Sequence, residues 1–325
     1  MQRRHFIQAG VALAATGPLS APIALAQSYP DHPIKIYQGF AAGGNADAMA
    51  RSVSVEMTKS MGQAFVVEAQ TGAGGTLASA AVARAKPDGY TLLLATGGHA
   101  VAGALFNTLP YRTVQDFEMV STITYFPFLL VANAESKYKS LGDVMAAARA
   151  APGTIAYGTA GIGSTHHLAG ELLAKMANVK LLHVPYRGDA ASLTALLAGD
   201  VPFIIAPPTA VITNIKAGKL RALATTGPQR WPGLPEVPTV AEQGVAGYDV
   251  RSWGGLMAPA GTPRAIIDRL NAEVNKALLV PAVKARLEEM GGEARGSTPE
   301  EMRTMVADQT AKWTQVVADA KIPKQ

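Results

Sequence analysis

Cysteine is absent from all 325 residues. Its absence excludes disulfides, thiolate metal sites, a cysteine nucleophile and a lipidated N-terminal cysteine. Aromatic residues are also scarce, at 6%, and the charged residues, at 16%, give a net charge of +5 with no basic run. Scattered charge with few aromatic residues argues against a nucleic-acid partner. Beyond the N-terminus, no segment holds the roughly 20 consecutive apolar residues of a membrane-spanning helix, so we expect the mature chain to be soluble.

The first 26 residues are typical of an export signal rather than of a folded domain. Arg3 and Arg4 open a basic start, a mildly apolar run follows, and residues 24–26, Ala-Leu-Ala, give the small-x-small pattern of a signal-peptidase site. The segment Arg-Arg-x-Phe-Ile resembles a twin-arginine signal, and an ordinary secretory signal that happens to carry two arginines stays equally open. In either case we expect the mature chain to start near Gln27, outside the cytoplasm.

The rest of the chain alternates between strand and helix patterns. Apolar residues make up 48% of the sequence, and its length suggests about two domains. Continuous apolar strands separated by helices, at residues 34–94 and again at 141–225, predict parallel sheets covered on both faces. Two longer strand-like stretches, 121–131 and 248–258, are interpreted as crossings between the domains. We therefore predict an α/β fold of two Rossmann-like domains with the ligand between them. Domain 1 would contain residues 27–125 and 251–325, and domain 2 would contain residues 126–250.

The C-terminal part is predicted to be helical. Thr262 and Pro263 predict an N-cap followed by a proline at the first helical position. Pro281 opens another helix, which the glycine pair at 291–292 ends. Residues 298–301, Thr-Pro-Glu-Glu, have the spacing of a capping box before a last helix.

Two glycine loops carry the main functional signal. The first, residues 39–47, follows a short apolar strand, and the second, residues 158–166, repeats the arrangement in the other predicted domain. Glycine removes the Cβ atoms that keep a ligand away from the backbone, and the first amides of a helix have no partners inside it. Glycine used only to make a sharp turn is the plain alternative for either loop. Two such loops, one per domain, favour a cleft for a small ligand with two anionic ends.

Other kinds of chemistry find little support in the residues. Residues 71–78 lack the third glycine of the dinucleotide fingerprint. Ser164 does not stand in a Gly-x-Ser-x-Gly elbow and is better explained as a helix N-cap. His166 and His167 are adjacent and point to different helix faces, so we expect no metal site, and we expect no cofactor. Some side chains could contact a ligand but equally suit packing or surface roles: Phe40, Tyr186, Arg187, Arg251 and Trp253.

Taken together, these segments resemble the periplasmic solute-binding proteins of tripartite tricarboxylate transporters, also called the Bordetella uptake gene family. The first matching loop reads Phe-Ala-Ala-Gly-Gly-x-x-Asp, and the resemblance extends from about Tyr29 to Trp313. It rests on segments that follow in the family's order: 34–36, 40–47, 72–75, 85–93, 109–111, 167–171, 183–188, 215–221, 237–239 and 258–263.

The resemblance implies a type II-like periplasmic binding protein, whose two domains close on the ligand like a hinged trap. It implies a receptor without catalysis that binds a small carboxylate in the periplasm and passes it transiently to membrane transporter subunits. We expect such a receptor to be a monomer. The residues it implies on one wall are Phe40, Ala41, Gly43, Gly44 and Asp47, with Gly97 contributing. On the other wall it implies Thr159, Gly163, Ser164, Thr165 and His166.

The sequence departs from the family pattern at three places. Gly39 stands where proline is usual, Gly254 replaces a bulkier residue, and residues 206–208, Ala-Pro-Pro, replace Asp-Asn-Leu. Losing that aspartate leaves no acid to receive a ligand amine. We therefore expect Ala206 and Pro207 to set ligand choice, favouring a dicarboxylate or an aromatic carboxylate over an amino acid.

Two rival functions stay open from the sequence. An extracytoplasmic sensor that reports its ligand to a membrane signalling partner needs the same closing trap. An exported hydrolase could use His166 or Asp47, although the sequence shows no nucleophile and base at a suitable spacing.

Overall fold

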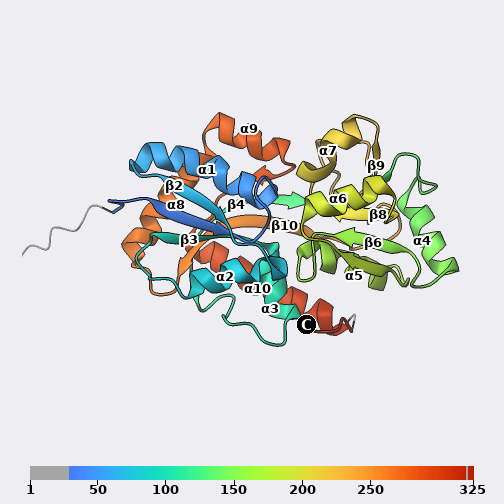
Figure 1. The fold of residues 1–325 in the computed structure, drawn as a ribbon, viewed down its shortest axis with the longest axis horizontal. Coiled ribbons are helices and arrows are strands. Elements are labelled where there is room, and N and C mark those ends of the chain that lie inside the picture. The colour runs from blue at the N-terminus through green and yellow to red at the C-terminus, as the bar shows by residue number, and fades with distance from the viewer. Residues whose placement is uncertain (1–28, 320) are drawn as a thin grey trace, which may run out of the picture.

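The protein consists of two lobes, each an α/β unit around its own sheet (Figure 1). A computed structural model describes residues 29–319 and 321–325. The sheet of the first lobe has the order β11-β4-β10-β3-β1-β2, and that of the second lobe has the order β7-β6-β8-β5-β9. The strands of the first sheet are β1 (Ile34–Gln38), β2 (Phe65–Ala69), β3 (Thr91–Thr96), β4 (Phe117–Pro127), β10 (Arg251–Pro259) and β11 (Glu293–Ala294). Those of the second are β5 (Leu129–Asn133), β6 (Ala156–Thr159), β7 (Leu182–Pro185), β8 (Phe203–Ala206) and β9 (Leu220–Thr225).

Helices cover both sheets. Those of the first lobe are α1 (Asn45–Met61), α2 (Thr76–Ala83), α3 (Gly97–Leu105), α8 (Arg264–Leu278), α9 (Pro281–Glu289) and α10 (Pro299–Asp319), with a short 3-10 turn, η1, at Ala73–Gly75. Those of the second lobe are α4 (Leu141–Ala150), α5 (Thr165–Met176), α6 (Asp189–Ala198) and α7 (Pro208–Lys216).

The core of the first lobe follows the apolar pattern of the sequence. In α1, the side chains of Met49, Val53 and Met57 recur every four residues and are fully buried, so they form one apolar stripe along the helix. Beneath them lie Ile34 and Ile36 of β1, which are also fully buried.

The prediction of parallel strands at residues 34–94 and 141–225 is confirmed, although each sheet as a whole is mixed. Strands β1, β2 and β3 run parallel, but β10 and β4 run antiparallel to their neighbours, as β5 does in the second sheet. The antiparallel strands β4, β5 and β10 lie at the two predicted crossings, and β4 and β10 are buried along most of their length. A strand buried on both faces reads as a continuous apolar run, whichever way its neighbours point.

The two predicted crossings between the lobes are confirmed, and they lie side by side. Strand β4 leaves the first sheet at Pro127, and β5 enters the second after the single residue Phe128. Strand β10 returns and pairs with β4 from Arg251 opposite Pro127 to Pro259 opposite Phe117. One antiparallel ribbon therefore makes both connections between the sheets.

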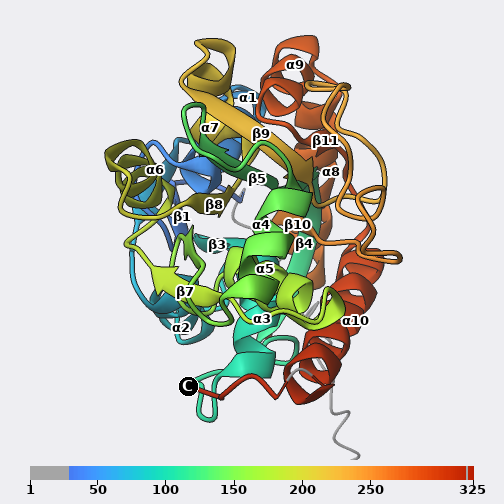
Figure 2. The same cartoon turned by 90° about the vertical axis from the view of Figure 1, so that its right-hand side faces the viewer.

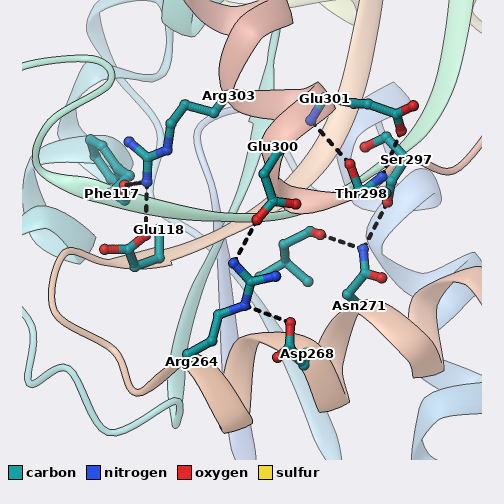
Figure 3. A network of polar contacts seen from close by, with 11 residues as sticks. Phe117, Glu118, Arg264, Asp268, Asn271, Ser297, Thr298, Glu300, Glu301 and Arg303 are labelled. Atoms are coloured by element: carbon teal, nitrogen blue, oxygen red, sulfur yellow. Dashed lines mark hydrogen bonds and ion pairs between the residues drawn. The ribbon is translucent and has the colours of Figure 1, made fainter.

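Polar contacts fix the C-terminal helices to the first sheet (Figure 3). Arg303 donates hydrogen bonds to the carbonyl of Phe117 and to Glu118, while Asn271 donates to the carbonyls of Val120 and Ser297. The predicted capping box is confirmed by reciprocal hydrogen bonds between residues 298 and 301.

The predicted cap of α8 is wrong. Pro263 itself occupies the N-cap position, without a side-chain cap. The Thr262 hydroxyl instead donates to the carbonyl of Pro259 at 2.8 Å and thereby closes the turn that follows β10.

The lobes also contact each other away from the ribbon. Figure 2 shows α10 running along one side of the molecule, and its C-terminal part packs against α5 of the second lobe. There, Nζ of Lys175 donates to the carbonyl of Asp319 at 2.8 Å. Among the described residues, no helix combines the length and apolar character that crossing a membrane would require.

Candidate functional site

A cavity of about 760 Å³ lies between the two lobes and is lined by both. The first lobe contributes the loop before α1, residues 40–44, together with the starts of α1 and α3. The second contributes the starts of α5, α6 and α7. These segments follow the carboxyl ends of β1, β3, β6, β7 and β8, which is where α/β sheets bind their ligands.

Five helix N-termini therefore meet at one space. No side chain caps the first turn of α1, α3, α6 or α7. In α5, by contrast, Oγ of Ser164 accepts a hydrogen bond from the His167 amide, which confirms the predicted cap. Uncapped first-turn amides carry partial positive charge and seek acceptors. The cavity wall can therefore bind an anion without a cationic side chain.

The first glycine loop is held by its own backbone and by α1. The amide of Gly44 donates to the carbonyl of Ala41, and the amide of Gly43 donates to Oδ2 of Asp47 at 3.1 Å. Burial of Asp47 opposes ionisation, but hydrogen bonds from Arg51 and Gly43 outweigh it, and together they lower the pKa of this carboxyl. Asp47, in the first turn of α1, thus stabilises the loop.

The second glycine loop is held by hydroxyl groups. Oγ of Ser164 donates to the carbonyl of Gly161 at 2.6 Å. Oγ1 of Thr159 accepts from the Gly161 amide and lies 2.7 Å from Nε2 of His183. Both hydroxyls are therefore occupied in shaping the turn.

Most of the site residues predicted from the sequence line the cavity. Those that do are Phe40, Ala41, Gly43, Gly44, Ser164, Thr165, His166 and Pro207. Those that lie outside the lining are Asp47, Gly97, Thr159, Gly163 and Ala206.

The residues outside the lining support it from behind. A Cβ atom on Gly97 would stand 2.7 Å from Oγ1 of Thr165, so this glycine lets α3 approach α5. Gly163 packs against Gly74 and Phe106 of the first lobe, and Ala206 is fully buried at the end of β8. Trp253 is also buried, in the core of the first lobe, and it therefore has the packing role that the sequence left open.

The prediction that losing the aspartate at position 206 leaves no acid to receive a ligand amine is wrong. Asp189, the first residue of α6, lines the cavity, and so do Glu288 and Glu289 of α9. From the sequence, the strand-end rule was applied only to the two glycine loops. Applied to the strand that ends at Pro185, the same rule would have found Asp189.

His166 and Asp189 form an unsatisfied polar pair on the cavity wall. Nε2 of His166 lies 3.4 Å from Oδ1 of Asp189, and the two side chains are 10% and 18% exposed. Neither ring nitrogen of His166 nor Oδ1 of Asp189 has a hydrogen-bond partner among the described residues. Burial raises the pKa of Asp189 to about 7 and lowers that of His166 to about 3. The pair therefore has hydrogen-bonding capacity to spare.

The two lobes touch on more than one side of the cavity. Oγ1 of Thr209 in α7 donates to Oδ1 of Asn45 in α1 at 3.2 Å. Elsewhere, a Cβ atom on Gly74 of η1 would lie 2.9 Å from the carbonyl oxygen of Ile162, so the backbone of η1 contacts that of the second glycine loop.

Catalytic groups are not assembled at Ser164. Its hydroxyl donates to a backbone carbonyl and accepts from a backbone amide, which leaves no base to activate it. Within residues 29–319 and 321–325, no cluster of three or more His, Asp or Glu side chains suits a metal ion.

Three solved structures with about one-third sequence identity share this architecture. The R. palustris protein Rpa4515, solved with adipate, has a TM-score of 0.87 and 34% identity over 91% of this chain and 100% of its own. The periplasmic binding protein BugD has a TM-score of 0.86 and 33% identity over 91% and 100%. MatC from Rhodopseudomonas palustris, with bound malate, has a TM-score of 0.84 and 34% identity over 89% and 100%. The α/β fold with a cleft between two sheets is therefore confirmed as that of periplasmic binding proteins.

The sequence itself agrees with these structures. Residues 49–322 match the family described as "Tripartite tricarboxylate transporter family receptor". This match runs from within α1 to the residues after α10 and includes all of the second lobe. The chain belongs to the tripartite tricarboxylate transporter receptor family.

Proposed function

We propose that this protein is a periplasmic receptor that captures a small organic carboxylate between its lobes for a tripartite tricarboxylate-type transporter. The observation that carries the proposal is the convergence of four uncapped helix N-termini on one cavity. Such ends stabilise an anion by their amides and dipoles together. Two of them belong to each lobe, so a ligand with an acceptor at each end would join the lobes.

A dicarboxylate or an aromatic carboxylate suits this cavity best. Phe40, Phe126, Phe128 and Trp231 line it and offer apolar contact to a carbon skeleton between the polar ends. Adipate and malate, which two structures of similar fold hold, are both small dicarboxylic acids.

Ligand capture would proceed by closure of two domains. In this proposal, residues 27–125 and 251–325 move against residues 126–250, and the ribbon of β4 and β10 bends near Pro127. Thr209 with Asn45, and Gly74 with the backbone of Ile162, would then be contacts of the closed form. Ligand that bridges the lobes favours closure because it binds the closed form better.

The remaining parts of the proposal follow from membership of a receptor family. The protein would act in the periplasm as a monomer, without catalysis, and would meet membrane transporter subunits transiently. The export signal predicted for residues 1–26 lies outside the described residues.

A thermal-denaturation screen tests the proposal. The protein is unfolded and refolded in ligand-free buffer, then melted with mono-, di-, tri- and aromatic carboxylates. A ligand at a hundredfold excess over its Kd adds about 2.7 kcal/mol to the free energy of unfolding, so at least one acid should raise Tm by several degrees. The matched diamides, which have the same length but no charge, should not. If no carboxylate raises Tm, the proposal is wrong.

A further inference from the structure

We infer that the ligand carries a hydrogen-bond donor, a hydroxyl or an ammonium, in addition to its carboxylate, and that Asp189 accepts from this donor. The inference rests on the proposed function and narrows its ligand class. It starts from an acid on the cavity wall that the fold itself does not use.

No hydrogen bond among the described residues explains why Oδ1 of Asp189 is buried. Asp189 is the first residue of α6, yet its side chain does not cap that helix. Among the described residues, no lysine or arginine lies within 4.0 Å of its carboxylate, and the near neighbour His166 makes no hydrogen bond with it. Buried carboxylates are usually paired, because an unpaired one is costly to remove from water. A partner from the ligand would supply what is missing.

The opposite end of the ligand has other places to bind. Asp189 supplies negative charge at the N-terminus of α6 with no lysine or arginine paired to it, whereas Asp47 in the first turn of α1 is paired with Arg51. The uncapped ends of α1, α3 and α7 are therefore left for the ligand carboxylate. A donor group facing α6 would reach Oδ1 of Asp189 and could also meet the free acceptor nitrogen of a neutral His166. The two ends of the site therefore differ in chemical character.

This asymmetry predicts discrimination against unsubstituted acids. A site built to hydrogen-bond a ligand group rejects an analogue that lacks it, since its buried polar atoms are then left without partners. A hydrogen bond to a charged acceptor is typically worth about tenfold to a hundredfold in affinity.

The test compares matched ligands on one carbon skeleton. The screen above first identifies the skeleton that stabilises the protein most. Calorimetric titration then compares its unsubstituted, hydroxyl and amino forms: for four carbons, these are succinate, malate and aspartate. Wild-type protein should bind a substituted form at least about tenfold more tightly than the unsubstituted one.

Variants of Asp189 show whether this residue causes the preference for a substituted acid, and whether the ligand's donor is a hydroxyl or an ammonium. Asp189→Ala should abolish the preference. Asp189→Asn, which keeps a neutral acceptor, should retain a preference for a hydroxyl but lose one for an ammonium. Asp308→Ala, which removes an exposed acid of α10, is the matched control and should change neither. Melting of each ligand-free variant checks that it folds, and the wild-type comparison needs no variant.

Each outcome decides the matter. Equal or tighter binding of the unsubstituted acid by wild-type protein would overturn the inference alone, as would a preference that survives in a folded Asp189→Ala. A diacid bound more tightly at low pH would also overturn it, because Asp189 would then be a protonated donor. If no carboxylate binds at all, the proposed function fails first, and the inference falls with it.

Discussion

At the scale of single residues, two glycines of α1 offer a matched comparison. Gly43 precedes the helix and Gly62 ends it, with φ of 78° and 72°. A Cβ atom at either position would meet nothing within 4 Å. Both glycines are exposed, but only Gly43 lines the cavity. Backbone strain and ligand access can therefore be separated.

We expect Gly43→Val and Gly62→Val to destabilise the protein similarly, because left-handed backbone costs an L-residue roughly 1–2 kcal/mol. The Gly43 variant alone should also lose at least about tenfold in carboxylate affinity, because its side chain blocks approach to the loop amides. Chemical denaturation measures the first effect and calorimetric titration the second. Unchanged affinity in a folded Gly43 variant would remove this loop from the site.

At the scale of elements, α1 shows how burial decides the effect of one substitution. Val53 is fully buried and Val55 is 54% exposed, although the two are separated by one residue. Both lose the same two methyl groups when changed to alanine, and both gain the better helix propensity of alanine. The difference between them therefore reports packing alone.

We expect Val53→Ala to lower the free energy of unfolding by about 1–2 kcal/mol, since the lost apolar contact outweighs the gain in propensity. Val55→Ala should leave it unchanged or raise it by up to about 0.6 kcal/mol. Urea denaturation of both variants is the measurement. Similar losses in both would mean that the buried stripe of α1 does not govern its stability.

The apolar pattern of the sequence predicted most elements to within a few residues, because burial is local information. The strand-like stretch 121–131 was interpreted correctly as a crossing, and in the structure it contains the end of β4 and the start of β5. Strand direction in β4 and β10 was not predictable, because antiparallel pairing of buried strands leaves the apolar pattern unchanged. Glycine spacing predicted the two loops, but Asp189 carries no motif. Its role depends on which strand ends the fold brings together.

At the scale of the whole molecule, three buried histidines and the half-buried His183 make stability depend on pH. Burial lowers the pKa of His99 and His167 to about 4 and that of His166 and His183 to about 3. Each is neutral in the folded protein at pH 5, where the unfolded chain, with a histidine pKa near 6.5, is largely protonated. Asp189 has the opposite effect on the pH dependence of stability, because its raised pKa makes the folded state take up a proton below about pH 7.

We therefore expect stability to fall as pH drops below about 6.5 towards 4, because four histidines outweigh Asp189. Each proton bound only by the unfolded chain changes the free energy of unfolding by about 1.4 kcal/mol per pH unit. Urea midpoints of the ligand-free protein at pH 7.5, 6.5, 5.5 and 4.5 measure the trend. A midpoint that stays level or rises between pH 6.5 and 4.5 would contradict it.

The uncapped helix ends around the cavity have a consequence for ionic strength. Amide dipoles are fixed in the wall and bring no counterions that a bound anion must displace. Interactions inside such a cavity are also screened less than those between exposed charges. We expect the Kd of the best carboxylate to change by less than about threefold between 50 and 500 mM NaCl, measured by calorimetric titration. A steep loss of affinity would instead assign the binding to the rim cations Lys216 and Arg286. A receptor built in this way would work equally well in dilute and in salty surroundings.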